Sequence, residues 1–218
     1  MRYAFVSDVH GHVDVLRQFL AHLDRDAIGR IVTLGDIGND NCYDLLRAHQ
    51  AVGVFGNYEV SGHVRLSAEN LAFVLGLRPL FVEDDFLAAH AVPFYPAGLF
   101  SARDFADYMQ RTGGSWRGLF RYPNDEDDSL FQIVEELRVR RKRLFFHGHT
   151  HRQQVWRILP DDRPRELRET RIALDPSASY IVGVGSLGRP EEGPSPRYVV
   201  YDRERDEIEL RTLSHSES

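Results

Sequence analysis

The first quarter of the chain alternates short apolar runs with segments whose apolar residues recur at helical spacing. The runs at 2–8, 30–36 and 51–57 predict buried strands, and the spacing at 12–23 and 42–49 predicts helices. Because alternating strands and helices build parallel sheets with helical crossovers, we expect these three strands to lie parallel in one sheet.

The remaining segments change from a mixed pattern to one dominated by strands. They predict a helix at 71–77, paired strands at 79–84 and 86–92, helices at 101–113 and 129–143, and strands at 144–149, 153–159, 179–187, 197–202 and 207–213. The C-terminal part is therefore largely β, and a second sheet is expected. Residues 214–218 are expected to form a frayed tail.

Length and composition fit a single domain spanning residues 1–218. The 218 residues are 42% hydrophobic, which is enough to bury a sizeable core. The single cysteine, Cys42, has no partner for an internal disulfide, and the N-terminal stretch lacks the apolar core of a signal peptide. No apolar run reaches the roughly 18 residues of a membrane span. We therefore expect a soluble, cytoplasmic protein that does not associate with membranes.

The net charge of −6 argues against a general nucleic-acid-binding surface. The one basic run, RVRRKR at 138–143, lies at the end of a predicted helix. Cations at that position complement the helix dipole, which explains the run without a polyanionic partner.

Polar residues follow the first three predicted strands. Asp8 and His10 lie two positions apart after the first strand, Asp36 follows the second, and Asn57 follows the third. If strand geometry continues through Asp8 and His10, their side chains point to the same side. Since the carboxyl ends of parallel strands meet at one edge of a sheet, we expect all four residues to converge there.

Three histidines add to this set. His90 lies in a short apolar strand, and His149 and His151 are again two positions apart after an apolar run. A lone Asp after a strand is usually a cap, and a lone His is usually structural. Seven such residues at predicted strand ends, several beside a glycine that allows close backbone approach, instead predict a metal site.

This arrangement resembles the calcineurin-like metallophosphoesterase family, whose motifs run D-x-H, G-D, G-N-H-[DE], a lone H and G-H-x-H. The matching stretches are SDVHG, LGD, GNYE, AAHA and GHTH, which begin at residues 7, 34, 56, 88 and 148. The later stretch 183–202, GVGSLGRPEEGPSPRYVVYD, is similar to a strand–turn–strand in the small bacterial phosphodiesterase-like members.

The resemblance implies an α/β fold, a four-layer αββα sandwich with two mixed β-sheets flanked by helices. It also implies two divalent metal ions. One would be held by Asp8, His10, Asp36 and His151, and the other by Asp36, Asn57, His90 and His149, with Asp36 bridging. Oxygen and nitrogen ligands without thiolates favour Mn, Fe, Zn, Ni or Mg over copper. Such a dinuclear centre would supply a metal-bridged hydroxide for attack on phosphorus without a covalent protein nucleophile.

Tyr58 stands where the family pattern usually has a histidine that contacts phosphate and protonates the leaving oxygen, and Glu59 is the acidic residue that would orient it. Tyrosine has an ordinary pKa of about 10, against about 6.5 for histidine, so it donates a hydrogen bond readily but delivers a proton poorly. We therefore take Tyr58 and Glu59 as candidate catalytic residues and expect a preference for good leaving groups. The alternative is that Tyr58 only packs its ring beside the site.

A variable helical insertion is expected around 94–128, directly after His90. It is rich in aromatic residues, glycine and arginine, and a segment placed there can form a wall or lid over the metals. Its arginines would then meet phosphate; they are Arg103, Arg111, Arg117 and Arg121. Alternatively, the insertion packs its aromatic residues on the sheet, so these arginines are not assigned to the site. His12 opens a predicted helix and His63 is expected on another, so both are expected to be surface or capping residues.

Three functions fit these residues. The leading one is a metal-dependent phosphodiesterase or phosphomonoesterase acting on a small phosphorylated molecule. A protein Ser/Thr phosphatase is suggested by SDVHGH, but the arginine that this branch carries soon after G-D is missing from GDIGNDN. A metal-binding scaffold without turnover is suggested only by Tyr58. The substrate and the oligomeric state are left open.

Overall fold

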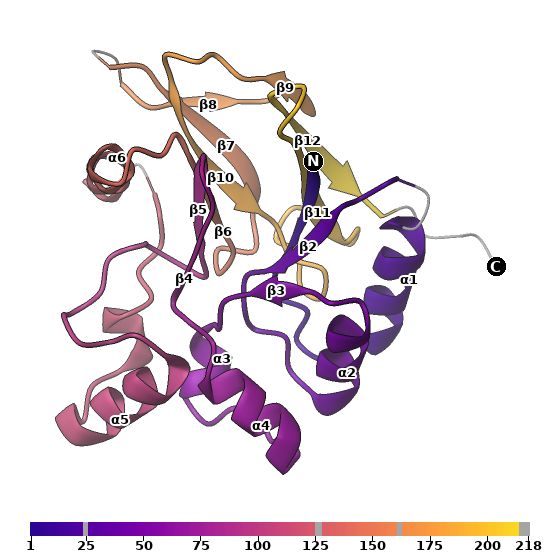
Figure 1. The fold of residues 1–218 in the computed structure, drawn as a ribbon, viewed down its shortest axis with the longest axis vertical. Coiled ribbons are helices and arrows are strands. Elements are labelled where there is room, and N and C mark those ends of the chain that lie inside the picture. Colours follow the sequence, from indigo (N-terminus) through magenta and orange to yellow (C-terminus); the bar gives the residue numbers. More distant parts are fainter. Residues whose placement is uncertain (24–25, 125–127, 161–162, 214–218) are drawn as a thin grey trace.

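The computed structural model describes residues 1–23, 26–124, 128–160 and 163–213, and it contains two six-stranded mixed sheets with helices on their outer sides (Figure 1). The tail expected at 214–218 lies outside these ranges. Within them, each helix is too short or too polar to cross a membrane.

The first sheet contains the strands predicted from the N-terminal part of the chain. Its order is β3 (Val52–Gly53), β2 (Arg30–Thr33), β1 (Arg2–Val6), β11 (Arg197–Asp202), β12 (Glu207–Thr212) and β9 (Arg171–Ala173). The first three strands run parallel, as predicted, and the C-terminal strands extend the sheet in antiparallel fashion beyond β1. The two ends of the chain thus form one sheet.

The second sheet is built from the middle of the chain. Its order is β4 (Leu80–Val82), β5 (Phe86–Ala89), β6 (Leu144–His147), β10 (Ser179–Val184), β7 (Gln153–Ile158) and β8 (Arg165–Leu167). Strands β5, β6 and β10 are parallel, and β4 pairs with β5 antiparallel, which confirms the predicted strand pair. A parallel centre in each sheet places several strand ends at the same edge.

Aromatic side chains fill the space between the sheets. Phe5 of β1 stacks on Phe146 of β6 with ring centroids 3.8 Å apart, and Phe86 of β5 meets both rings edge-on. Tyr3 belongs to the same cluster, whereas Ala4 of β1 belongs to the cluster on the outer face. This alternation follows from the period of two in a strand.

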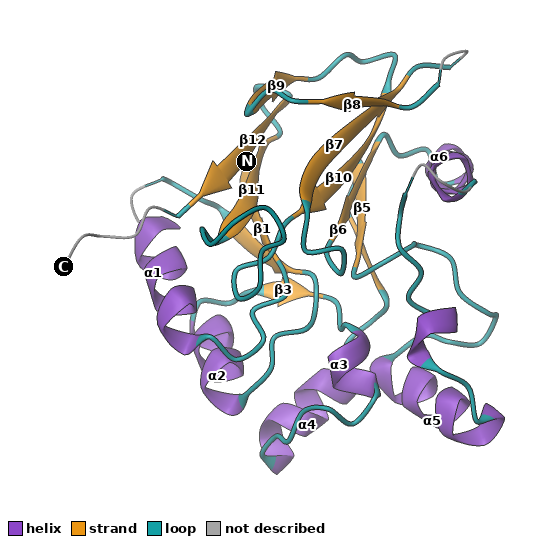
Figure 2. Ribbon diagram, turned by 180° about the vertical axis from the view of Figure 1, so that it is seen from behind, coloured by secondary structure: helices purple, strands orange, loops and turns teal. Residues whose placement is uncertain are grey.

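Helices cover the outer face of each sheet (Figure 2). The helices α1 (Val13–Leu23) and α2 (Asp40–Ala48) contribute to the cluster on the first sheet, and α6 (Ser129–Val139) to the cluster on the second. This arrangement confirms the predicted αββα sandwich. At one end of the sandwich lie α3 (Asn57–Val60), α4 (Ala68–Leu75), α5 (Ala102–Thr112) and the 3₁₀ helix η1 (Trp116–Gly118).

Several element boundaries differ from the prediction. Strands β1 and β2 end at Val6 and Thr33, before the polar residues that follow them, and β3 contains only two residues. Helix α6 ends at Val139, so most of the basic run follows the helix. The sequence pattern missed α3, η1, β8 and β9. The strands β8 and β9 have three residues each, with charged and exposed positions, and they exist because they pair with β7 and β12.

Replacing Phe146 by alanine should lower the free energy of unfolding by about 3–5 kcal/mol, because it opens a cavity where the two sheets meet. The matched control is Phe131→Ala, since Phe131 lies on α6 with 48% of its surface exposed. Urea unfolding followed by circular dichroism measures both. Equal losses for the two variants would contradict the central role of the aromatic cluster.

Candidate metal centre

The seven predicted metal ligands lie in or near the turns that follow parallel strands of both sheets. Asp8 follows β1 and Asp36 follows β2, while His90 directly follows β5 and His149 lies two residues after β6. Asn57 is the first residue of α3. Both sheets therefore contribute candidate ligands, and these residues converge at the strand ends as expected.

Five of the seven residues have a left-handed backbone conformation. The φ angles are 53° for Asp8, 49° for His10, 54° for Asp36, 64° for His149 and 55° for His151. The explanation from continued strand geometry was therefore wrong for Asp8 and His10: their side chains meet because the chain turns sharply. Non-glycine residues in this region are uncommon and cluster at functional sites, where the surrounding structure holds them.

Two glycines allow these turns to pack against one another. A Cβ atom on Gly148 would lie 1.9 Å from Ser7 Oγ, and one on Gly56 would lie 2.2 Å from Asp36 Oδ1. Both distances are far shorter than any van der Waals contact. The glycines beside the predicted ligands are therefore required by close approach of the chain to itself.

Asp8, His10 and His151 form one group of potential ligands. His151 Nε2 lies 3.2 Å from Asp8 Oδ1 and 3.2 Å from His10 Nε2, and His10 Nε2 lies 3.7 Å from Asp8 Oδ1. His151 Nδ1 donates to the carbonyl oxygen of Arg189 at 2.7 Å. This bond orients the ring so that His151 Nε2 points toward Asp8 and His10.

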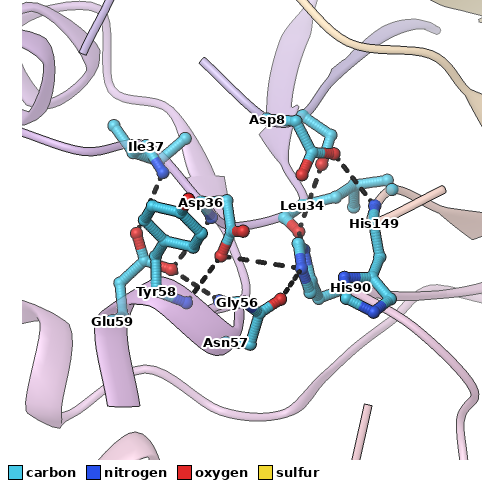
Figure 3. A network of polar contacts seen from close by, with 12 residues as sticks. Asp8, Leu34, Asp36, Ile37, Gly56, Asn57, Tyr58, Glu59, His90 and His149 are labelled. Atoms are coloured by element: carbon cyan, nitrogen blue, oxygen red, sulfur yellow. Dashed lines mark hydrogen bonds and ion pairs between the residues drawn. The ribbon is translucent and has the colours of Figure 1, made fainter. Parts of the chain in front are cut away.

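Asp36, His90 and Asn57 form a second group (Figure 3). His90 Nε2 lies 3.6 Å from Asp36 Oδ1 and 3.0 Å from Asn57 Oδ1. His90 Nδ1 donates to the Leu34 carbonyl oxygen at 2.6 Å, which directs Nε2 toward the two oxygens. Asp8 is close enough to Asp36 and His90 to join this group as well. By distance, Asp8 is common to both groups, so the role of Asp36 as the bridge stays a prediction.

His149 lies beside both groups, but its ring nitrogens are not close enough to the other ligand atoms for it to belong to either group. Its backbone N–H donates to Asp8 Oδ2 at 2.9 Å, and its ring centroid is 4.8 Å from that of His90. Its Nε2 is buried and has no hydrogen-bond partner among the described residues. A buried nitrogen of this kind is costly unless it has a ligand.

Burial and mutual repulsion make the metal-free site electrostatically unfavourable. Burial raises the pKa of Asp36 well above its ordinary value, and the nearby charges of Glu59 and Asp8 raise it further. For Asp8, burial acts in the same direction, but contact with His151 and the charge of His90 outweigh it and lower the pKa. Closely spaced carboxylates in a buried site are stabilised together only by added positive charge.

Two histidines of the site, His10 and His149, are in the form that metals bind. Burial lowers the pKa of His10 to about 4 and that of His149 to about 3, so both rings are neutral near pH 7. Cys42 takes no part, because it is buried in the cluster under α1 and α2, and burial raises its pKa to about 11. The residues present therefore fit divalent cations with oxygen and nitrogen ligands.

Glu59 holds the turns of the site together. Its Oε2 accepts from the backbone N–H groups of Asp36 and Gly56 at 2.9 and 2.7 Å, and its Oε1 accepts from Ile37 N and the Tyr43 hydroxyl at 2.9 and 2.8 Å (Figure 3). These four bonds use the acceptor capacity of the carboxylate. We therefore describe Glu59 as a positioning residue rather than one that meets substrate or orients Tyr58.

Tyr58 lies at the rim of the first group. Its backbone N–H donates to Asp36 Oδ1 at 2.9 Å, and its ring meets the His10 ring edge-on with centroids 4.6 Å apart. Its hydroxyl oxygen accepts from Arg189 Nη1 at 3.4 Å. The ring does pack beside the site, and the hydroxyl in addition has a cationic partner.

The 94–128 insertion forms an aromatic wall beside His149, in the part of it that the structure describes. The rings of Tyr122, Trp116 and Phe120 have centroids 4.6, 5.7 and 6.3 Å from that of His149. Two of its arginines lie over aromatic rings: Arg117 over Trp116, and Arg121 over Phe94. Both expectations were thus partly met, since the insertion is a wall and also packs helix α5 through an apolar cluster with Phe55.

The remaining histidine candidates lie at the surface. His12 is exposed and its carbonyl accepts from Leu16 N at the start of α1. His63 is also exposed, but it follows α3 rather than lying on a helix, and its Nδ1 is 2.6 Å from Ser61 Oγ. Neither joins the groups around Asp8.

Arg189 was missed by the sequence reasoning. It lies after β10, in the 183–202 segment that resembles a strand–turn–strand. The available signal was a cation directly following the Gly-Ser-Leu-Gly turn of 185–188. Only the fold shows that this turn lies against the backbone of Asp8.

Comparisons with known proteins agree with this geometry. A family model described as the calcineurin-like phosphoesterase superfamily domain matches residues 1–206. The uncharacterized protein MJ0912 of Methanocaldococcus jannaschii is 26% identical over 238 residues, covering 95% of this chain and 85% of that protein.

Two solved structures are similar in fold. A metallophosphoesterase from Sphaerobacter thermophilus has a TM-score of 0.70 at 20% identity, covering 98% of this chain and 89% of its own. A structure described as a novel archaeal phosphodiesterase has a TM-score of 0.51 at 14% identity, covering 98% of this chain and 100% of its own. At these identities the likeness concerns the fold.

Glu59→Gln should lower the free energy of unfolding of the metal-free protein by about 1–3 kcal/mol, because an amide nitrogen then faces buried N–H donors. Lost repulsion with Asp36 offsets part of this cost. Glu69→Gln is the control, since the Glu69 side chain is 74% exposed and should change stability by less than about 0.5 kcal/mol. Similar urea midpoints for both variants would refute the positioning role.

Divalent metal should raise the melting temperature of the wild-type protein. At about 100 times the Kd, binding adds roughly 2.7 kcal/mol, which for a chain of this size corresponds to about 5–10 °C. Asp36→Asn should melt higher than wild type without metal, because a buried carboxylate is removed, but should gain little from added Mn²⁺. Asp14→Asn, at a side chain 89% exposed, is the control. An equal rise for Asp36→Asn would place the metal elsewhere.

Proposed function

This chain belongs to the calcineurin-like phosphoesterase superfamily, and we propose that it is a metal-dependent hydrolase that cleaves a phosphodiester or phosphomonoester bond of a small molecule. The observation that supports this most directly is the convergence of Asp8 and Asp36, both buried, with histidine ring nitrogens from both sheets. This set has the composition of a dinuclear divalent centre.

The roles of the seven ligands are part of the proposal. One ion would be held by Asp8, His10 and His151 with Asp36, and the other by Asp36, Asn57, His90 and His149. Two cations there would supply Lewis-acid activation of water and of the phosphate oxygens. Mn, Fe, Zn, Ni and Mg all suit these ligands.

The protein's own residues prepare the site for this chemistry. Glu59 fixes the turn that carries Asp36, while the Leu34 and Arg189 carbonyls orient His90 and His151. The Tyr122 and Trp116 rings shield His149 on the side of the insertion. A shielded, preorganised site needs little rearrangement when charge develops on the phosphate.

A small substrate is supported by a hollow beside the centre. A cavity of about 340 Å³ is lined by residues that include Tyr122, Arg152 and Trp156, together with Thr150, which lies between the two site histidines. This size suits a small organic group. Because Tyr58 replaces an imidazole acid, we expect faster cleavage of esters with good leaving groups than of alkyl esters.

Covalent catalysis is not part of this proposal. The Cys42 thiol is buried away from the site, and burial keeps it protonated by raising its pKa to about 11. A thiol in this state is a poor nucleophile, so water is the nucleophile that the site favours.

A cytoplasmic location completes the proposal. The single cysteine is free, which fits a reducing compartment. Fractionation of cells that express the chain with a short C-terminal tag measures this, and recovery outside the cytoplasm would refute it.

The function is tested by hydrolysis of bis-p-nitrophenyl phosphate and p-nitrophenyl phosphate by protein stripped of metal and reloaded with Mn, Ni, Zn or Mg. We expect metal-dependent turnover that Asp36→Asn lowers by at least about 10³-fold. The diester-to-monoester ratio gives the substrate class, and an alkyl diester tests the leaving-group preference. Metal binding without turnover on any ester would instead favour the metal-binding scaffold, for which Tyr58 is the supporting observation.

A further inference from the structure

Arg189 is a cation placed at the metal centre without an acidic partner. Its guanidinium is exposed, its side-chain hydrogen bond goes to the Tyr58 hydroxyl at 3.4 Å, and no ion pair joins it to a carboxylate within the described ranges. Other arginines of the same region are paired, as Arg197 is with Glu192. Among the described residues, the Arg189 guanidinium forms no ion pair, although three buried carboxylates belong to the same site. This suggests that an anionic group of the substrate is its partner.

The backbone of Arg189 is fixed to the site by the turn that precedes it. Ser186 Oγ donates to the Asp8 carbonyl at 2.8 Å, and Gly188 N donates to the same oxygen at 3.0 Å. Arg189 N in turn donates to Ser186 Oγ at 2.8 Å, and the Arg189 carbonyl accepts from His151 Nδ1 at 2.7 Å. The backbone of Arg189 is therefore fixed relative to the first ligand group, Asp8, His10 and His151.

Gly188 shows how tight this attachment is. A Cβ atom on Gly188 would lie 2.2 Å from the Val9 carbonyl oxygen, so only glycine lets the turn lie this close to the Asp8 loop. The backbone position of Arg189 is thus set by contacts to the same turns that carry the candidate metal ligands.

Tyr58 contacts Arg189 from the side of the second ligand group, Asp36, His90 and Asn57. Its backbone is held by Asp36, its ring lies against His10, and its hydroxyl oxygen accepts from Arg189. Because that oxygen already accepts a hydrogen bond from a cation, its own proton is free to be donated to another acceptor. Arg189 and Tyr58 therefore span the rim of the site above His10.

We propose that Arg189 and Tyr58 together bind the non-bridging oxygens of the substrate phosphate, with the guanidinium fork and the phenol hydroxyl as donors. The planar fork matches phosphate geometry, and one arginine N–H stays on the Tyr58 oxygen. The pair takes the place of the histidine that contacts phosphate in the family pattern. This inference rests on the proposed function for the identity of its ligand.

The test is the affinity of metal-loaded protein for inorganic phosphate, measured by titration calorimetry. Arg189→Gln should weaken binding about 10- to 100-fold, since hydrogen bonds to charged groups are strong, and Tyr58→Phe about 3- to 10-fold. Arg189→Lys, which keeps the charge but loses the fork, should fall between wild type and Arg189→Gln. Arg17→Gln removes one surface charge on α1 and should bind like wild type.

Two further readouts separate the inference from the proposed function. Metal content and melting temperature should be unchanged in Arg189→Gln, and in the ester assay its loss should fall mainly on KM. If no ester is hydrolysed but Arg189→Gln still loses phosphate affinity, the anion site stands and the hydrolase proposal fails. If wild type turns over and Arg189→Gln matches it in phosphate affinity and KM, or if wild type does not bind phosphate, the inference is overturned.

Discussion

The structure depends above all on three carboxylates, Asp8, Asp36 and Glu59, buried where the two sheets meet. Buried charges of one sign are stable only when donors or cations surround them. Glu59 is satisfied by four donors from the protein, whereas Asp8 and Asp36 receive single backbone N–H bonds from His149 and Tyr58. The remaining negative charge is what makes the site a receptor for cations.

The sandwich brings these groups together, and the turns aim them. Parallel strands in both sheets end at one edge, so short turns from distant parts of the chain meet there (Figure 1). The left-handed residues at Asp8, Asp36 and His149 each carry a conformational cost of about 1–2 kcal/mol. That cost is offset by the packing of the aromatic layer and by backbone bonds such as Asp8 N to the Gly35 carbonyl at 3.1 Å. The core thus holds in place a site that would not form on its own.

Tyr58 and Arg189 occupy the rim of this site. Tyr58 keeps the backbone contact to Asp36 and extends its hydroxyl to Arg189, whose loop is bonded to Asp8 and His151. The rim therefore offers hydrogen-bond donors from Arg189 and Tyr58. Under our proposal, these donors bind phosphate and neutralise its charge rather than deliver a proton to the leaving group.

The sequence by itself predicted the order of most strands and helices and the candidate ligand residues, because apolar periodicity and spacing of polar residues are local properties. The stacking of the two sheets was expected from the family resemblance alone. The sequence pattern did not reveal β8, β9 or α3, whose three- and four-residue segments are held by neighbouring elements. Only the tertiary structure decided that Asp8 and His10 meet through left-handed turns, that Glu59 binds backbone, and that Arg189 reaches Tyr58 across 131 positions of the chain. Such contacts depend on how two sheets pack, and the free energy of packing is shared among residues far apart in sequence.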